Sequence, residues 1–124
     1  MIREFNVGFH IPGALGAGPF NIRWNAPDDC TLLHVSGVTS NDAATTMTIG
    51  DETTAALHLA AWDIGAGANT VHEKGNASAF SDFATGQYPR ILDGDTIVIA
   101  VDPNGPEQGT SGADLTLVLR FAEG

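Results

Sequence analysis

The sequence predicts an all-β protein, an antiparallel β-sandwich of the jelly-roll or Greek-key type. Short segments alternate apolar and polar residues at a period of two, which is the pattern of half-buried β-strands. Clusters of Gly, Pro, Asn and Asp separate these segments at fairly even spacing, as in sandwiches and barrels. The chain has 124 residues, enough for about six to eight such strands in two sheets packed face to face. We therefore expect one domain over residues 1–124.

Two clearly alternating strands are predicted first, over residues 5–11 and 20–25. Every second residue in each segment is a large apolar one, and the residues between are small or polar. One face of each strand is therefore expected to point into the core. Pro12 and Gly13 are expected to end the first strand, because proline cannot donate a ladder hydrogen bond. Trp24 shares the apolar parity of the second strand and is expected in the core.

A loop rich in glycine and alanine joins these two strands, over residues 13–18. Its glycines do not follow the order G-x-G-x-x-G, and a strand follows where a nucleotide-binding loop needs a helix N-terminus. We expect a flexible or closely packed connection. Because the loop is long and uncharged, Leu15 is a candidate contact residue.

Three further strands are predicted over residues 31–38, 45–49 and 96–102. The first of them has apolar residues on both faces, which predicts a central strand covered on both sides. The last is β-branched throughout its centre and is the clearest strand of the chain. A final strand follows from Leu115. It lies antiparallel to residues 96–102 if residues 103–112 form a simple hairpin connection.

The middle of the chain is ambiguous. Residues 54–64 carry apolar side chains at helical spacing, and Asp51 or Thr53 is available as an N-cap. The same segment also alternates as a strand, so a short helix within residues 53–64 and a strand both stay open. Residues 68–90 are weakly patterned and are expected to form a long loop with one strand.

No residue pattern in the sequence points to catalysis. The four histidines are far apart, so none forms a sequence-local metal-binding pair: His10, His34, His58 and His72. A metal-dependent lyase or isomerase of the cupin type would need these histidines to converge in space. There is no G-x-S-x-G nucleophile elbow. We expect a non-enzymatic protein with no cofactor and no metal ligands.

The single cysteine is expected to be a small buried apolar residue. Cys30 cannot form an internal disulfide, because the chain has no second cysteine. Asp28 and Asp29 precede it and raise the pKa of a neighbouring thiol, which disfavours a reactive thiolate.

Charge and hydropathy exclude several partners. Fifteen acidic residues stand against five Lys and Arg, giving a formal net charge of -10, and such a chain repels phosphate backbones. We expect no nucleic-acid binding. The longest aliphatic stretch, residues 97–101, is far shorter than the ~20 residues of a membrane span, so no membrane partner is expected. The N-terminus lacks the pattern of a signal peptide, and we expect the protein to be made and folded in the cytoplasm.

Two aromatic residues outside the predicted core are candidate contact residues. Trp62 and Tyr88 lie in the ambiguous and weakly patterned parts of the chain. Sugar-binding sandwiches usually present exposed Trp or Tyr rings as platforms. These two residues therefore keep open a carbohydrate- or host-receptor-binding function.

Three segments, residues 34–42, 91–102 and 109–124, resemble small β-rich virion-associated proteins of tailed bacteriophages. The segments read His34-Val-Ser-Gly-Val-Thr-Ser-Asn-Asp42, Ile91-Leu-Asp-Gly-Asp-Thr-Ile-Val-Ile-Ala-Val-Asp102 and Gly109-Thr-Ser-Gly-Ala-Asp-Leu-Thr-Leu-Val-Leu-Arg-Phe-Ala-Glu-Gly124. The resemblance covers roughly residues 30–124. The resemblance lies in the residue sequences of predicted strands and turns. It therefore assigns no functional site residue to this chain.

The resemblance implies a virion structural protein that decorates a capsid. We expect the protein to self-associate, as a homotrimer, because the strand-rich ends of the chain leave edges that oligomerisation would cover. It would bind the viral capsid protein and stabilise the larger assembly. Its location would be the virion, after synthesis in the host cytoplasm. The alternative is a carbohydrate- or host-receptor-binding module of a phage tail or fibre.

Overall fold

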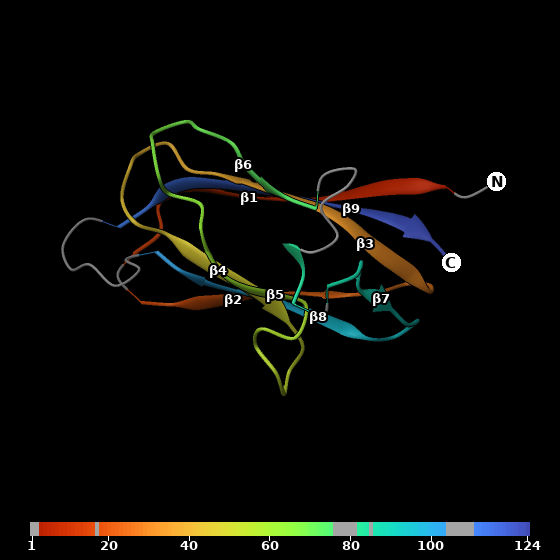
Figure 1. Cartoon of the computed structure of the whole chain (residues 1–124). Coiled ribbons are helices and arrows are strands. Elements are labelled where there is room, and N and C mark those ends of the chain that lie inside the picture. The colour runs from red at the N-terminus through yellow and green to blue at the C-terminus, as the bar shows by residue number, and fades with distance from the viewer. Residues whose placement is uncertain (1–2, 17, 76–81, 85, 104–110) are drawn as a thin grey trace.

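The computed structural model describes residues 3–16, 18–75, 82–84, 86–103 and 111–124. These residues form two antiparallel sheets packed against each other and contain no α-helix (Figure 1). The five-stranded sheet has the order β1-β9-β3-β6, with β7 also pairing β3, and its strands are β1 (Glu4–Ala14), β9 (Ala113–Glu123), β3 (Cys30–Val38), β6 (His72–Lys74) and β7 (Arg90–Ile91). The four-stranded sheet has the order β2-β8-β4-β5, and its strands are β2 (Phe20–Asn25), β8 (Thr96–Asp102), β4 (Thr46–Gly50) and β5 (Leu59–Asp63). The all-β sandwich is confirmed.

The strands pair as one long hairpin that is rolled up. β1 pairs with β9, β2 with β8, β3 with β6 and β7, and β4 with β5, so each pair encloses the next. Two more pairings, β3 with β9 and β4 with β8, close the roll into two sheets. This nesting is the arrangement of a jelly roll.

The hairpin considered between the last two strands does not form. β8 belongs to the four-stranded sheet and β9 to the five-stranded sheet, so the chain crosses from one sheet to the other between them. Residues 104–110 of this connection lie outside the described part of the chain. β8 lies between β2 and β4, and β9 lies between β1 and β3, so neither has a free edge at which the two could pair.

Side chains from both sheets fill the space between them. The central strands supply most of the fully buried ones: Leu32, Val35, Met47, Ile49, Ile97, Ile99, Val101, Leu115, Leu117, Leu119 and Phe121. Burying each such side chain contributes about 1.5–3 kcal/mol. At one end of the core the ring of Phe121 stacks on Trp24 at 4.8 Å and on Phe5 at 5.3 Å between centroids. Trp24 therefore packs on the core, as its parity predicted.

β1 runs two residues past the predicted end at Pro12. The register between β1 and β9 shifts between Ile11 and Ala14, so the strand bulges there and then continues. Gly13 takes a φ of 79° in the bulge, and its N–H donates to Asp114 Oδ1 at 2.6 Å. Proline is tolerated because β1 is an edge strand.

The helix considered within residues 53–64 is absent. A turn and then β5 occupy this segment. The N–H of His58 donates to the carbonyl of Ile49 at 2.9 Å, so the backbone pairs across a hairpin and not along a helix. Asp51 accepts the backbone N–H of Thr54 at 2.7 Å, as an N-cap would, but the bond closes a turn. Tertiary pairing here overrides a weak helical preference.

β3 is an interior strand of its sheet, as predicted, but it is not covered on both sides, because its outer face is partly exposed. A bulge explains its apolar residues on both faces. The register with β9 shifts between Leu32 and His34, which leaves Leu33 as the extra residue. Leu32 and Val35 are fully buried, whereas Leu33 and His34 between them are partly exposed. The bulge therefore turns two consecutive side chains to the outer face of the sheet.

Candidate functional site

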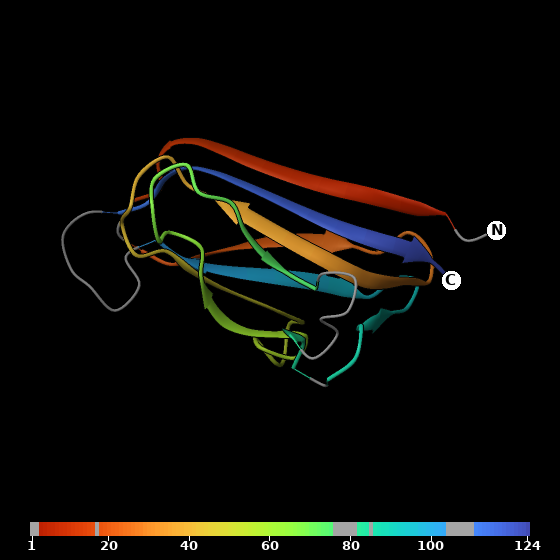
Figure 2. The same ribbon diagram turned by 45° about the horizontal axis from the view of Figure 1, so that its top comes forward.

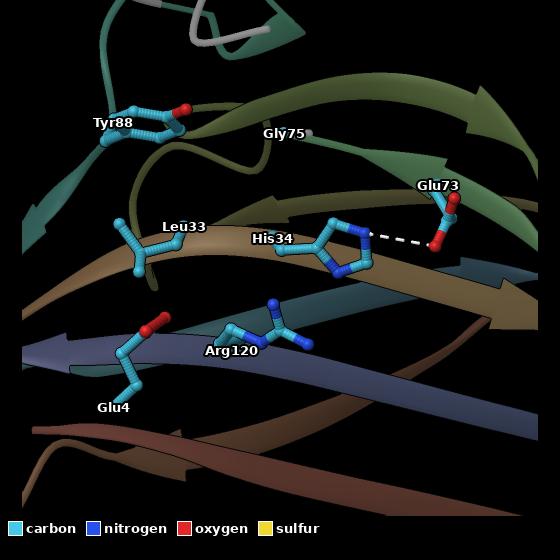
Figure 3. A pocket seen from close by; sticks show the side chains of 7 residues that line it. All are labelled: Glu4, Leu33, His34, Glu73, Gly75, Tyr88 and Arg120. Carbon is cyan, nitrogen blue, oxygen red and sulfur yellow. Dashed lines mark ion pairs between the residues drawn. The ribbon is translucent and has the colours of Figure 1, made fainter. Parts of the chain in front are cut away.

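A groove lies on the outer face of the five-stranded sheet. It has a volume of about 390 Å³, and the residues that line it are Glu4, Leu33, His34, Glu73, Gly75, Tyr88 and Arg120 (Figure 3). Glu4 comes from β1, Arg120 from β9, Leu33 and His34 from β3, and Glu73 from β6. Four strands of one sheet therefore contribute, and the site rests on rigid elements.

Strand register brings the polar side chains of the groove together. Arg120 on β9 is the register partner of His34 on β3 and of Asn6 on β1. Glu73 on β6 pairs with Ser36, two residues along β3 from His34. Directly opposite residues on one face are close neighbours in an antiparallel pair. The guanidinium and the imidazole therefore sit side by side on the sheet, as Figure 3 shows.

The imidazole of His34 is held by Glu73. The distance from His34 Nε2 to Glu73 Oε1 is 3.3 Å, and the histidine side chain is 17 % exposed against 49 % for the glutamate. The ring is thus largely covered, and its carboxylate partner lies at the solvent boundary. A carboxylate on one ring nitrogen fixes the ring's orientation and favours the proton on that nitrogen.

Arg120 has an exposed side chain within reach of the groove. Among the residues that the structure describes, no carboxylate lies within ion-pairing distance of its guanidinium. Two arginines elsewhere do form ion pairs: Arg23 with Glu52 at 2.7 Å and Arg90 with Asp29 at 3.4 Å. Arg120 can therefore direct its donors at a ligand.

Gly75, directly after β6, lines the groove. Gly75 has a φ of 82°, and a Cβ at this position would lie 2.8 Å from the ring of Phe83 and in collision with the carbonyl of Leu33. Glycine is thus required by both the backbone conformation and the space. Phe83 packs edge-on against Tyr88 at 5.8 Å between ring centroids, which holds the tyrosine ring at the side of the groove.

A second hollow lies around His58. It has a volume of about 200 Å³ and is lined in part by Asp51, Leu57, Arg90 and Asp95. Burial lowers the pKa of His58 below its ordinary value, although Asp51 and Asp95 act in the opposite direction. The imidazole is therefore favoured in its neutral form at this place.

The candidate contact residues from the sequence do not form one surface. Leu15 is partly buried, and its N–H donates to the carbonyl of Gly112 at 2.9 Å, beyond the C-terminal end of β3. Trp62 packs on the core from β5, and Lys74 Nζ lies 5.9 Å from its ring centroid. Tyr88 lies near the other end of β3 and lines the groove.

The four histidines do not converge. His10 Nδ1 lies 2.8 Å from Thr116 Oγ1, and His72 Nε2 lies 2.7 Å from the carbonyl of Ala66. Asn6 on β1 and His34 on β3 are both register partners of Arg120 on β9. His10 lies four residues further along β1 than Asn6, so it is not level with His34 on the sheet. Within the described ranges no three His, Cys, Asp or Glu side chains are grouped so that they could hold a metal ion.

Cys30 is 1 % exposed and unpaired. Burial raises the pKa of its thiol, and the neighbouring Asp29 and Asp28 raise it further. The residue is the buried apolar one that the sequence predicted, and its thiol is held protonated.

Sequence reasoning missed the constellation of Arg120, His34 and Glu73. The three residues come from strands that are distant in the chain, and only the rolled pairing places them together. The one signal available in the sequence was the pair Leu33-His34, which interrupts the alternation of its strand.

Comparisons of the chain with protein-family models, with curated proteins and with solved structures found no match. No helix in the described part of the chain has the length and apolar character needed to cross a bilayer.

Proposed function

We propose that the protein is a non-enzymatic structural protein that self-associates as a trimer and decorates a phage capsid. The observation that carries self-association is the open edge of the sandwich formed by β1 and β2. Both are terminal strands of their sheets, and the rings of Phe5 on β1 and Trp24 on β2 lie 6.4 Å apart. The two free edges are therefore at the same side of the molecule, and Figure 2 shows β1 running along the margin beside β9.

This edge exposes apolar surface. The inward-facing side chains of both strands pack on the core but stay only partly buried: Phe5, Val7, Phe9, Ile11, Phe20, Ile22 and Trp24. β1 is 11 residues long, and after Glu4 it carries no Lys, Arg, Asp or Glu. Long edge strands without charges pair readily with another chain unless something covers them. A neighbouring copy of the protein would cover both the unpaired backbone groups and the apolar rim.

The opposite edge of the sandwich is better protected. β5 and β6 have 5 and 3 residues, and the ammonium of Lys74 lies over the ring of Trp62 between them. A short strand and a lysine are two of the devices by which proteins block edge pairing. Pro12 and the bulge after Ile11 block pairing only near the end of β1, so the contrast between the edges favours residues 4–11 of β1 together with β2 as the self-association surface. Three copies can close a ring when the free edge of β1 in each copy meets the free edge of β2 in the next, because a head-to-tail contact joins two different surfaces.

The net charge of -10 fits this arrangement. The acidic residues lie mainly in turns and the β1–β2 edge is nearly uncharged, so copies can meet along the edge while their acidic loops face outward. Capsid decoration itself rests on the resemblance to virion-associated phage proteins.

The test introduces lysines on the edge strand. The variant Asn6→Lys/His10→Lys places two charges on the outward face of β1, and Ser36→Lys on the interior strand β3 serves as the matched control. We expect the double variant to sediment as a smaller species and the control to behave like the wild type. The wild-type protein should also co-sediment with capsids that lack it. A double variant with unchanged mass contradicts the proposed edge, and failure to co-sediment contradicts decoration.

A second candidate function, a carbohydrate- or host-receptor-binding module, is favoured by the groove. Tyr88 lines it beside polar side chains, which is the combination that sugar-binding sites use. A glycan array probed with the wild-type protein tests this candidate independently of oligomerisation.

A further inference from the structure

We propose that the groove binds a sugar acid with a single carboxylate, a hexuronate or a sialate, and that Arg120 binds the carboxylate. This inference rests on the second candidate function, and it names the ligand class. The groove lies on the outer face of the five-stranded sheet, and of its lining residues only Glu4 belongs to the edge formed by β1 and β2. It can therefore act whether or not the protein decorates a capsid.

The group that would bind the carboxylate is the guanidinium of Arg120. Arg120 is exposed and has no carboxylate at ion-pairing distance in the described chain. The protein carries 15 acidic residues and only five Lys and Arg, so an arginine left without an acidic partner beside a groove is notable. A planar guanidinium matches a carboxylate through two parallel hydrogen bonds.

The negative charges around the groove limit the charge of its ligand. Glu4 and Glu73 line the groove on either side of Arg120 and His34 (Figure 3). Together with the net charge of -10, they oppose a ligand that carries two or more negative charges. A phosphate or a sulfated chain is therefore disfavoured, and one carboxylate is the anion that the groove accepts.

The hydrogen-bond acceptors in the groove favour a ligand that carries hydroxyl groups. Ionised carboxylates only accept hydrogen bonds, so Glu4 and Glu73 need donors from the ligand. When His34 donates from Nε2 to Glu73, its other ring nitrogen is also an acceptor in the neutral ring. A polyhydroxylated acid supplies a carboxylate for the arginine and hydroxyl protons for these acceptors.

Part of the groove lining is apolar. Tyr88 and Leu33 line the same groove, and Phe83 fixes the tyrosine ring by edge-on packing. The C–H face of a pyranose ring can lie against such a surface. The volume of about 390 Å³ falls within the range of ordinary small-molecule sites.

The test compares matched ligands by titration calorimetry with the full chain. The ligands are sodium galacturonate and sodium N-acetylneuraminate, with the methyl ester of galacturonate and free galactose as neutral analogues. A short peptide with a free C-terminal carboxylate is titrated as a competing kind of ligand. We expect the acids to bind and the neutral analogues to bind about tenfold or more weakly, because a hydrogen-bonded charge pair is lost.

The matched variants are Arg120→Gln and Arg23→Gln. Both remove an exposed arginine, but Arg23 is paired with Glu52 on the other sheet at 2.7 Å. We expect Arg120→Gln to weaken binding of the acids about tenfold or more and Arg23→Gln to leave it unchanged. Thermal melting of both variants confirms that they fold.

Four results overturn the inference. They are equal binding of the acid and its ester, unchanged binding by Arg120→Gln, tighter binding of a short peptide through its C-terminal carboxylate, and no binding of any sugar acid. If the glycan array shows binding of neutral sugars only, the second candidate function stands and the sugar-acid inference fails. If no glycan on the array binds, the second candidate function fails as well.

Discussion

Arg120 and His34 are register partners on neighbouring strands, and they present a guanidinium and an imidazole side by side on the outer face of the five-stranded sheet. This relationship depends on the bulge at Leu33, which turns Leu33 and His34 outward between the buried Leu32 and Val35. The groove therefore owes its polar groups to an irregularity in an otherwise regular sheet, as is common at functional sites.

The first prediction concerns Gly75, which lines the groove. Gly75→Ala would place a Cβ against the ring of Phe83 and the carbonyl of Leu33, at a φ of 82°. We expect a loss of about 2 kcal/mol or more in the free energy of unfolding. The matched control is Gly86→Ala, since Gly86 has a φ of 71° but open space around it. The control should lose only about 1 kcal/mol. Urea unfolding measures both, and equal losses would show that the packing is not as described.

The second prediction concerns the aromatic end of the core. Phe121 is fully buried and stacks on both Phe5 and Trp24. We expect Phe121→Ala to cost about 3–5 kcal/mol, because it removes a large buried side chain and leaves a cavity. Val71→Ala is the control, as Val71 is 58 % exposed, and it should change stability by less than about 0.5 kcal/mol. A loss below about 1 kcal/mol for Phe121→Ala would contradict the described core.

The third prediction concerns pH. The pKa of His58 is lowered in the folded protein, chiefly by burial. The unfolded chain, with a histidine pKa of about 6.5, therefore takes up the proton first as the pH falls. The resulting stability is fully present above about 6.5 and is lost as the pH drops below that value and through the folded pKa.

The measurement is the melting temperature between pH 8 and pH 5 for the wild type and for His58→Gln. We expect the wild type to lose stability relative to the variant over this range. The comparison cancels the general decrease in charge repulsion, which acts on both proteins. Asp51 and Asp114 do not interfere, because hydrogen bonds from Thr54 and from Gly13 hold their pKa values below the ordinary range. Parallel curves would contradict the burial of His58.

The sequence predicts the strands far better than it predicts their partners. Residues 5–11 and 20–25 alternate cleanly because each strand has one buried face, and β1 and β2 lie where the alternation places them. Residues 54–64 carry two periods at once, and only the hairpin contact between His58 and Ile49 decides for a strand. Local pattern alone could not choose between them.

The pairing of the last two strands shows the same limit. β8 and β9 are adjacent in sequence, yet the nested roll places them in different sheets. The groove depends on this roll as well, because it brings Arg120 and Glu73 to either side of β3. Side-chain chemistry at each position was readable from the sequence, but its convergence was not.

The most direct test of the proposed function is sedimentation velocity of the wild-type chain across micromolar concentrations. The mass of one chain is 12.9 kDa. Self-association through the β1–β2 edge predicts a single species with three times that mass that persists on dilution through this range. A species of 12.9 kDa at every concentration would contradict it.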